Sequence, residues 1–338
     1  MPNISIKDVA VYAKVSKSTV SRVVSQKGYV SDSSRIAVMQ AIEELGYSPN
    51  TLARSLVSNQ SKTIGICVPF LNTPFFASMM EGIESEADRN DYDVFIYHTK
   101  DSIEQEKRAI EKLIARRVDG IIIIPVDTKG RQIKKAIGST PCVYLIRQPS
   151  ELQSINMVSV DDYMGSRNAL EVLIHKGHRK IGMIRGVDVY STMRDRWRAC
   201  EDVCNQYGID LDLRYVKTSE LNFKSAHLAA KELLADYKEF SAIYSLHYWG
   251  CAGLIKEARD RGIQIPRDIS LSSFEAFDDW NTIMPMSITS NRYPSVEMGQ
   301  SAVKLLHQII QSDSNISTSS VLLHPSFQEG KSVVEFKD

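Results

Sequence analysis

The chain has 338 residues, enough for two or three domains with hydrophobic cores of their own, and its 41 basic residues balance 41 acidic ones. A neutral total excludes no class of partner. The distribution is uneven, because the stretch through Lys62 carries +4 and the remainder carries −4, which suits a nucleic-acid-binding N-terminal part.

Two short amphipathic helices joined by a tight turn are predicted at the N-terminus. The first begins near Ser5, where apolar residues start to recur at helical spacing: Ile6, Val9, Ala10 and Ala13. The second begins after Ser16, a residue type that caps helices, and its apolar stripe consists of Val20, Val23 and Val24. Two such helices indicate a helix-turn-helix.

The outer face of the second helix carries hydroxyls and cations and no acid: Lys17, Ser18, Ser21 and Arg22. Side chains of this kind reach guanine edges and phosphates in a DNA major groove. A polar outer face is also ordinary for a small helical pair, so spacing alone leaves DNA binding and a structural role open.

A third helix is predicted after Ser31, with Gly46 as its C-terminal stop. The apolar residues expected to face inward are Ile36, Met39, Ile42 and Leu45. Residues 1–46 are therefore expected to form a small all-α DNA-binding domain.

Several N-terminal residues carry a family resemblance: Ser5–Ala10, Ala13, Val15–Ser16 and Thr19–Val23. In order and position they resemble the opening of the lactose/galactose repressor family of bacterial transcription regulators. One departure is Lys14, where the family usually has a turn glycine and where lysine fits at some conformational cost. The resemblance implies DNA contacts from this domain by Ser5, Ser16, Lys17, Ser18, Thr19, Ser21, Arg22 and Tyr29.

Residues 47–62 resemble the family's hinge helix and linker. Asn50 is expected to cap a short helix, which would be marginal in water by itself. The resemblance implies that the helix pairs with its copy in a dimer and folds on DNA, with Leu56 wedged into the minor groove and Asn50 and Arg54 also at the DNA. Packing of Leu56 against the rest of the protein is the alternative.

From Thr63 onward, short β-branched runs alternate with helical stretches, which is typical of parallel α/β folds. The first series of predicted strands is Thr63–Val68, Asp93–Tyr97, Gly120–Ile124 and Cys142–Ile146. The second series is Lys180–Ile184, Tyr215–Thr218, Ala242–Leu246 and Ile269–Phe274. We expect two doubly wound parallel-sheet subdomains of periplasmic-binding-protein type, with a cleft between them.

The family resemblance extends over this second part. Matching segments are Asn72–Phe76, Val160–Asp162, Gly177–Gly182, Ile265–Ser270 and Glu297–Gly299. They imply one subdomain of about 63–160 plus 292–320 and another of about 161–291 plus 321–338. Because the tail has no heptad helix of the kind that makes tetramers in the family, a homodimer is expected.

Ligands of open α/β sheets bind beyond the carboxyl ends of the strands. The candidate effector-binding residues there are Phe75, Phe76, Arg147, Arg196, Leu221, His247, Tyr248 and Glu275. The resemblance implies that Phe75 and Phe76 stack on the ligand and that Arg196 clamps its oxygens. A pure core role is the alternative for the two phenylalanines.

Departures from the family's pattern lie at the same strand ends. His247 and Tyr248 replace the usual Asn-Asp, Glu275 replaces an aspartate, and Ile146 stands where an aspartate is common. The hydrogen-bonding groups of the pocket are therefore changed. We expect a sugar or amino-sugar rather than a common hexose, with Glu275 accepting from hydroxyls or pairing with an amine.

Other functions are disfavoured by what the sequence lacks. It has no phosphate loop, dinucleotide glycine motif, metal-spaced His/Cys set or nucleophile elbow, so we predict no catalytic residue, metal or cofactor. His247, Tyr248 and Glu275 could pass for an acid/base set, but polar groups in a ligand pocket need no catalysis to explain them. A transporter's solute-binding protein would not carry the N-terminal domain.

The expected location is the cytoplasm. The N-terminus has no signal-peptide pattern, and the longest apolar run, Gly120 to Val126, is too short to cross a bilayer. The five cysteines are scattered in apolar surroundings, as reduced thiols are. We therefore predict a sequence-specific transcription regulator, a repressor, that binds a pseudo-palindromic operator under the control of a small sugar-like effector.

Overall fold

The computed structural model describes residues 4–25, 28–47, 60–276, 287–312 and 318–336. Contacts divide the chain into two units, Met1–Lys62 and Thr63–Asp338, which we call the head and the body. Among the described residues, no helix is long and apolar enough to cross a membrane.

The head is a three-helix domain whose described helices are α1 (Ile6–Tyr12), α2 (Lys17–Ser25) and α3 (Asp32–Leu45). The Ser16 hydroxyl accepts the Thr19 N–H at 3.1 Å, as the sequence predicts for an N-cap. Gly46 ends α3 with a φ of 60°, a left-handed conformation that glycine adopts without strain. A small core joins the three helices: Val9, Ala10, Val20, Val23, Val38 and Ala41.

Two of the four residues predicted to face inward from α3 do not do so. Ile36 and Met39 are 58% and 56% exposed, whereas Val38 and Ala41 are fully buried. The face toward α1 and α2 is centred on Val38 and Ala41, so Ile36 and Met39 lie on its flank. Several apolar stripes are possible in this helix, and only the packing of the neighbouring helices selects one.

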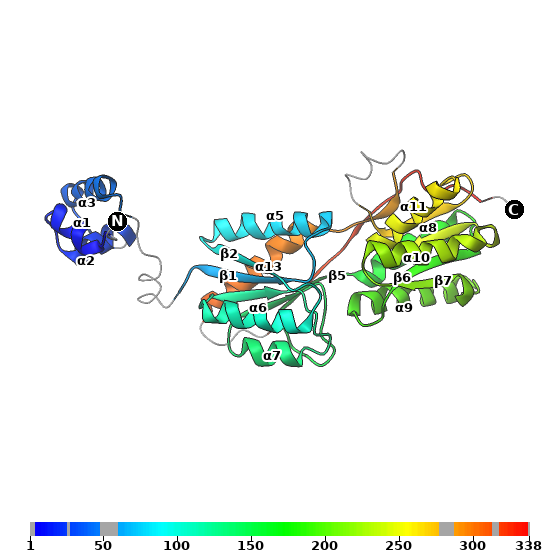
Figure 1. The fold of residues 1–338 in the computed structure, drawn as a ribbon, viewed down its shortest axis with the longest axis horizontal. Helices are drawn as coiled ribbons and strands as arrows, with labels where there is room; N and C mark the ends of the chain where they lie inside the picture. The colour runs from blue at the N-terminus through cyan, green and yellow to red at the C-terminus, as the bar shows by residue number, and fades with distance from the viewer. Residues whose placement is uncertain (1–3, 26–27, 48–59, 277–286, 313–317, 337–338) are drawn as a thin grey trace. The chain divides into compact units, whose positions relative to one another are not determined.

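The first half of the body is a six-stranded parallel sheet in the order β11-β5-β4-β3-β1-β2 (Figure 1). Its strands are β1 (Thr63–Val68), β2 (Asp93–His98), β3 (Gly120–Ile123), β4 (Cys142–Leu145), β5 (Met157–Val160) and β11 (Ser320–Leu323). Helices α5 (Pro74–Arg89) and α13 (Ser295–Gln311) cover one face, and α6 (Ile103–Ala115) and α7 (Arg131–Ile137) cover the other.

Helices α5 and α13 approach each other closely because both carry glycine at the contact. A Cβ atom on Gly82 would overlap the carbonyl of Val296, and one on Gly299 would overlap the carbonyl of Met79. The match of Glu297–Gly299 to the family therefore has a packing reason in this chain.

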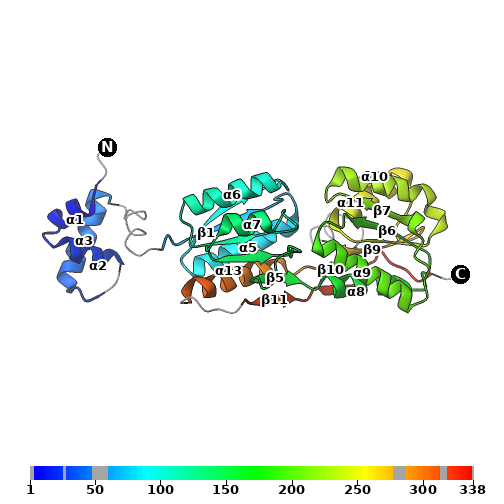
Figure 2. The ribbon, with the colours of Figure 1, turned by 90° about the horizontal axis from the view of Figure 1, so that it is seen from below.

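The second half of the body is a six-stranded sheet in the order β12-β10-β9-β8-β6-β7, in which only β12 runs antiparallel (Figure 2). Its strands are β6 (Ile181–Gly186), β7 (Val216–Ser219), β8 (Ala242–Ser245), β9 (Ser270–Glu275), β10 (Thr289–Arg292) and β12 (Ser326–Gln328). Its helices are α8 (Asp162–His175), α9 (Ser191–Gln206), α10 (Phe223–Leu233) and α11 (Tyr248–Arg261), with 3₁₀ turns at Leu213–Tyr215 and Leu234–Glu239. The predicted fold class is confirmed.

One predicted boundary is wrong. Residues 321–323 were expected in the second subdomain, but β11 pairs in parallel with β5 of the first sheet, with Ser320 opposite Met157. The strand follows α13, which packs on the first sheet, and the edge of β5 is the nearest place where its backbone can be paired. Along β11 exposed and half-buried residues alternate, whereas every residue of β1 is buried. Strand β11 is thus a partly exposed strand at the edge of the first sheet.

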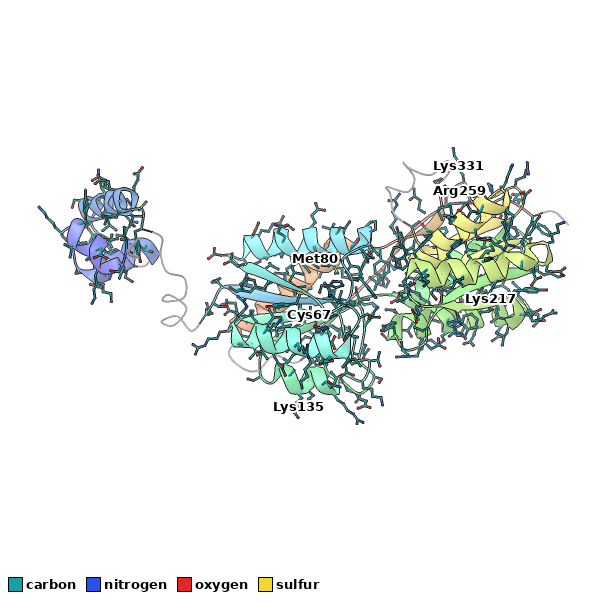
Figure 3. The ribbon with its side chains drawn as sticks, viewed as in Figure 1. Cys67, Met80, Lys135, Lys217, Arg259 and Lys331 are labelled. Atoms are coloured by element: carbon teal, nitrogen blue, oxygen red, sulfur yellow. The ribbon has the colours of Figure 1, made fainter. Side chains whose placement is uncertain are left out.

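The five cysteines are free thiols. Cys67 lies buried on β1 inside the first half, whereas Lys135 on α7 is exposed (Figure 3). Cys200 and Cys204 face the core of the second half from α9, and burial raises the pKa of the Cys204 thiol to about 11. Both are core residues, which was the favoured interpretation of their helical spacing.

Candidate functional site

A pocket lies in the body at the carboxyl ends of strands from both sheets. All eight residues predicted from the strand ends line it: Phe75, Phe76, Arg147, Arg196, Leu221, His247, Tyr248 and Glu275. Eight more residues line it, and of these the sequence pointed only to Ile146, as a departure from the family's pattern: Phe70, Thr73, Ile124, Ile146, Thr192, Met193, Trp249 and Tyr293. Four of these, Ile124, Ile146, Trp249 and Tyr293, directly adjoin a strand end or a predicted residue, so a wider window there would have included them. Thr192 and Met193 lie on α9, away from any strand end.

Arg196 is the most buried charge at the pocket, at 4% exposure. Its Nε donates to Asp162 at 2.7 Å, and its Nη1 donates to the carbonyl of Leu246 at the same distance. The guanidinium also lies 3.4 Å from the ring centroid of Phe274. These contacts fix the plane of the group, so it meets a ligand in one orientation.

Asp162, the partner of Arg196, begins α8 and is 5% exposed. Burial raises the pKa of its carboxyl to about 6, while the charge of Arg196 acts in the opposite direction. A carboxyl with this pKa is ionised at neutral pH, so Asp162 and Arg196 form an ion pair there. Arg196 would otherwise be a buried charge without a counter-ion.

His247 caps α11 and does not act as a base. Its Nδ1 accepts the Gly250 N–H at 3.1 Å, which leaves the proton on Nε2, 3.0 Å from the Ser219 hydroxyl. Burial lowers the pKa of this imidazole to about 3, with the charge of Arg196 acting in the same direction. His247 is thus a neutral, fixed donor, and the acid/base set considered from the sequence loses its base.

Glu275 ends β9 and is half-buried at the pocket. Its Oε1 accepts the backbone N–H of Tyr248 at 3.2 Å. Burial raises the pKa of this carboxyl, and the charge of Arg196 and the Tyr248 N–H oppose that rise. The group can accept from a ligand hydroxyl or pair with a ligand amine.

Aromatic rings from both halves line the pocket. Phe75 lies edge-to-face against Phe76 at 5.1 Å and against Tyr293 at 5.0 Å, and Tyr248 meets Trp249 at 4.9 Å. Phe75 and Phe76 also belong to the core of the first half. Their core role and their place in the pocket are therefore compatible, because one side of each ring can serve each purpose.

Arg147 lines the pocket from the first half and is 7% exposed. Its Nη1 donates to the carbonyl of Pro125 at 3.2 Å and to Asp101 at 3.4 Å. The preceding residue, Ile146, has a φ of 68°, a conformation that β-branched residues rarely adopt. The pocket edge at Arg147 is therefore built on strained backbone.

In the head, several of the predicted DNA-binding residues that the structure describes bond to neighbours on the surface. Ser5, Ser16 and Thr19 are engaged locally: Ser5 donates to Asp8 at 2.7 Å, and the Ser16 hydroxyl lies 2.8 Å from that of Thr19. The predicted contact residues exposed on or after α2 are Lys17, Ser18, Ser21, Arg22 and Tyr29, and the Ser18 hydroxyl also lies 2.7 Å from that of Ser16. Asn50, Arg54 and Leu56 lie outside the described residues.

The turn between α1 and α2 contains Lys14 with a φ of 53°. This is the left-handed conformation for which glycine is normally used. The predicted conformational cost of lysine at this position is therefore present in the structure.

Two family models together cover almost the whole chain. Residues 5–50 match "Bacterial regulatory proteins, lacI family", and residues 61–330 match "Periplasmic binding proteins and sugar binding domain of LacI family". The chain belongs to the LacI family. It is a DNA-binding repressor of that family with a sugar-binding domain, and the matched relatives are transcriptional repressors and regulators rather than enzymes.

Individual relatives agree along the length of this LacI-family chain. The ribose operon repressor of Bacillus subtilis (strain 168) is 30% identical over 308 residues, which cover 91% of this chain and 92% of that protein. The repressor PurR of Pasteurella multocida (strain Pm70) is 28% identical over 97% of this chain and 98% of its own. The crystal structure of the Lac repressor dimer bound to operator and the anti-inducer ONPF superposes with a TM-score of 0.87 at 25% identity, covering 98% of this chain and 99% of that one.

Proposed function

We propose that this LacI-family repressor is a cytoplasmic homodimer whose affinity for a pseudo-palindromic operator is set by a small sugar-like effector in the pocket of the body. The observation that carries the proposal is that one pocket gathers all eight strand-end residues around the buried Arg196. A pocket of rings with a few fixed polar groups is the usual form of a small-molecule site.

On the DNA side, α2 is the recognition helix. Its exposed Lys17, Ser18, Ser21 and Arg22 supply the base and phosphate contacts, and Tyr29 follows in the next loop. The twofold symmetry of a dimer places one recognition helix on each half-site. Asn50, Arg54 and Leu56 belong to the hinge part of the proposal, which rests on family resemblance.

On the effector side, the pocket offers one fixed cation, one carboxylate and aromatic faces. Arg196 suits vicinal hydroxyl oxygens, Glu275 suits a hydroxyl or an amine, and rings such as Phe75 and Tyr248 cover the apolar face of a sugar. We propose a sugar or amino-sugar other than a common hexose. The effector changes operator affinity by binding better to one arrangement of the two halves than to the other.

Capture of genomic fragments near physiological salt tests the DNA part. The full chain should enrich a short pseudo-palindrome, and Arg22→Glu on α2 should abolish the enrichment. Arg35→Glu is the matched control, because Arg35 lies exposed on α3 outside the predicted contact set and the charge change is the same. Equal loss in both variants would mean that total charge, and not the face of α2, carries the binding.

Calorimetric titration with neutral sugars and amino-sugars tests the effector part. A ligand with an amine should lose at least tenfold in affinity in Glu275→Gln, because the variant keeps an acceptor and removes the charge. A neutral sugar should lose less. Binding of only a plain hexose or a purine would contradict the proposed effector class.

A further inference from the structure

Three side chains beside the pocket connect the two halves of the body. Asp101 lies in the loop after β2, Arg147 follows β4, and Tyr190 precedes α9 in the second half. The Tyr190 hydroxyl donates to Asp101 Oδ2 at 2.7 Å. The guanidinium of Arg147 lies 3.6 Å from the centroid of the Tyr190 ring and donates to Asp101 Oδ1 at 3.4 Å. We call these three residues the clasp.

Two of the three clasp side chains, Arg147 and Tyr190, are well protected from water, whereas the side chain of Asp101 is 30% exposed. Arg147 is 7% exposed and Tyr190 is 8% exposed, so their stacking is a desolvated cation–π contact. Burial raises the pKa of Tyr190 to about 12, so its hydroxyl is a donor throughout the physiological range. The next residues along the chain add a further bond between the halves, in which the Gln148 N–H donates to the Ser191 hydroxyl at 3.0 Å.

Strained backbone adjoins both first-half members of the clasp. Lys100 and Asp101 have φ values of 54° and 52°, and Ile146, directly before Arg147, has 68°. Such conformations cost of order 1–3 kcal/mol each and persist where the surroundings impose them. The second half helps to impose these conformations through the contacts of Tyr190 with Asp101 and Arg147.

We propose that Asp101, Arg147 and Tyr190 hold the cleft in its closed arrangement through contacts within the protein itself, and so set the effector concentration at which the repressor responds. The role in closure stands independently, whereas the effect on the response rests on the proposed function. Contacts that favour the closed arrangement lower the free energy that a ligand must supply to populate it. Arg147 lies in both the clasp and the pocket lining, so the two are directly coupled.

Hydrogen exchange of the Gln148 amide in the full chain tests the closure, because this bond crosses between the halves and is untouched by the variants. Tyr190→Phe removes only the hydroxyl and should speed exchange about tenfold. Tyr163→Phe is the matched control, since the Tyr163 hydroxyl donates to Asp202 at 2.8 Å within the second half. It should leave Gln148 unchanged. Equal rates in the two variants would overturn the proposal.

A second variant, Asp101→Asn, tests the clasp independently in case Tyr190→Phe disturbs the fold. Asparagine tolerates the left-handed backbone of Asp101 and keeps an acceptor oxygen, so the fold is retained while the charge is lost. The Gln148 amide should exchange about threefold faster, and solution scattering should show a larger radius of gyration in both clasp variants. If the Gln148 amide exchanges at the wild-type rate in both Asp101→Asn and Tyr190→Phe, the proposed role of the clasp is wrong. Failure of the full chain to enrich an operator would contradict only the proposed function.

Discussion

The two walls of the pocket are built from different chemistry. Apart from Thr73 and Arg147, the first half contributes only rings and aliphatic groups: Phe70, Phe75, Phe76, Ile124 and Ile146. The second half contributes the fixed polar groups: Thr192, Arg196, His247 and Glu275. The polar groups of the pocket are therefore concentrated in the second half, which also contributes rings and apolar groups such as Tyr248, Trp249 and Leu221.

The same difference runs through the two sheets. Strand β1 is buried along its whole length and presents Ile64, Ile66 and Val68 to the core. Besides its apolar side chains, the second sheet also buries hydroxyls and an amide: Ser245, Ser270, Ser272, Ser273, Thr289, Ser290 and Asn291. Hydrogen bonds are directional and apolar packing is not, so the half that must hold polar groups in fixed orientations is also fixed by directional bonds.

The largest effect is expected from Arg196→Met. The variant leaves Asp162 as a buried carboxylate without its cation, so we expect a loss of about 3–5 kcal/mol from the free energy of unfolding of the body. Urea denaturation at neutral pH measures it. Asp162→Asn in the same chain should restore much of the loss, because it removes the unpaired charge.

Arg147→Met is the counterpart in the first half. Its carboxylate partner, Asp101, has a side chain that is 30% exposed, so the carboxylate stays partly hydrated when the arginine is removed. We therefore expect Arg147→Met to lower the free energy of unfolding less than Arg196→Met does, as measured by urea denaturation. An equal loss would contradict the difference between the two walls of the pocket.

Ile66→Ala tests the apolar half. Ile66 is fully buried in the core between the first sheet, α5 and α13, so the truncation should cost about 3 kcal/mol through lost burial and a residual cavity. Hydrogen exchange should show the loss in the first half alone. An equal loss of protection in the second half would mean that the two halves unfold as one cooperative unit.

The sequence predicts most of this fold, because buried parallel strands are short β-branched runs and helices bring their own caps. Strand β12 was missed because it is only three residues long, has one apolar side chain and lies at an edge of its sheet. Strand β5 was missed although it is as long as β3, β4 and β8, which were predicted. The eight predicted pocket residues could be found from their positions at strand ends and from the family resemblance. What no local pattern contains is the connection of Tyr190 to Asp101, since it depends on how two separate sheets face each other.

His247→Asn separates a fixed neutral donor from a titrating base. The folded pKa of about 3 lies below the unfolded value of 6.5, so protonation favours the unfolded chain and stability falls as pH drops below 6.5. Between pH 7 and pH 5 the wild type should lose about 2 kcal/mol more than the variant, because all other groups are common to both. Asparagine still caps α11. Parallel pH profiles of urea denaturation would show that His247 titrates normally.

Ser272→Ala gives the smallest effect and tests the hydroxyl-fixed sheet. The buried Ser272 hydroxyl donates to the carbonyl of Ala169 in α8 at 2.7 Å and so ties sheet to helix. Its removal should cost about 1 kcal/mol, because the carbonyl keeps its helical bond and loses only this second donor. Ser85→Ala in α5 is the control, since that hydroxyl bonds to Gly82 within its own helix. Urea denaturation should show a loss only for Ser272→Ala. Equal effects would mean that a hydroxyl joining sheet to helix stabilises the fold no more than one bonded within its own helix.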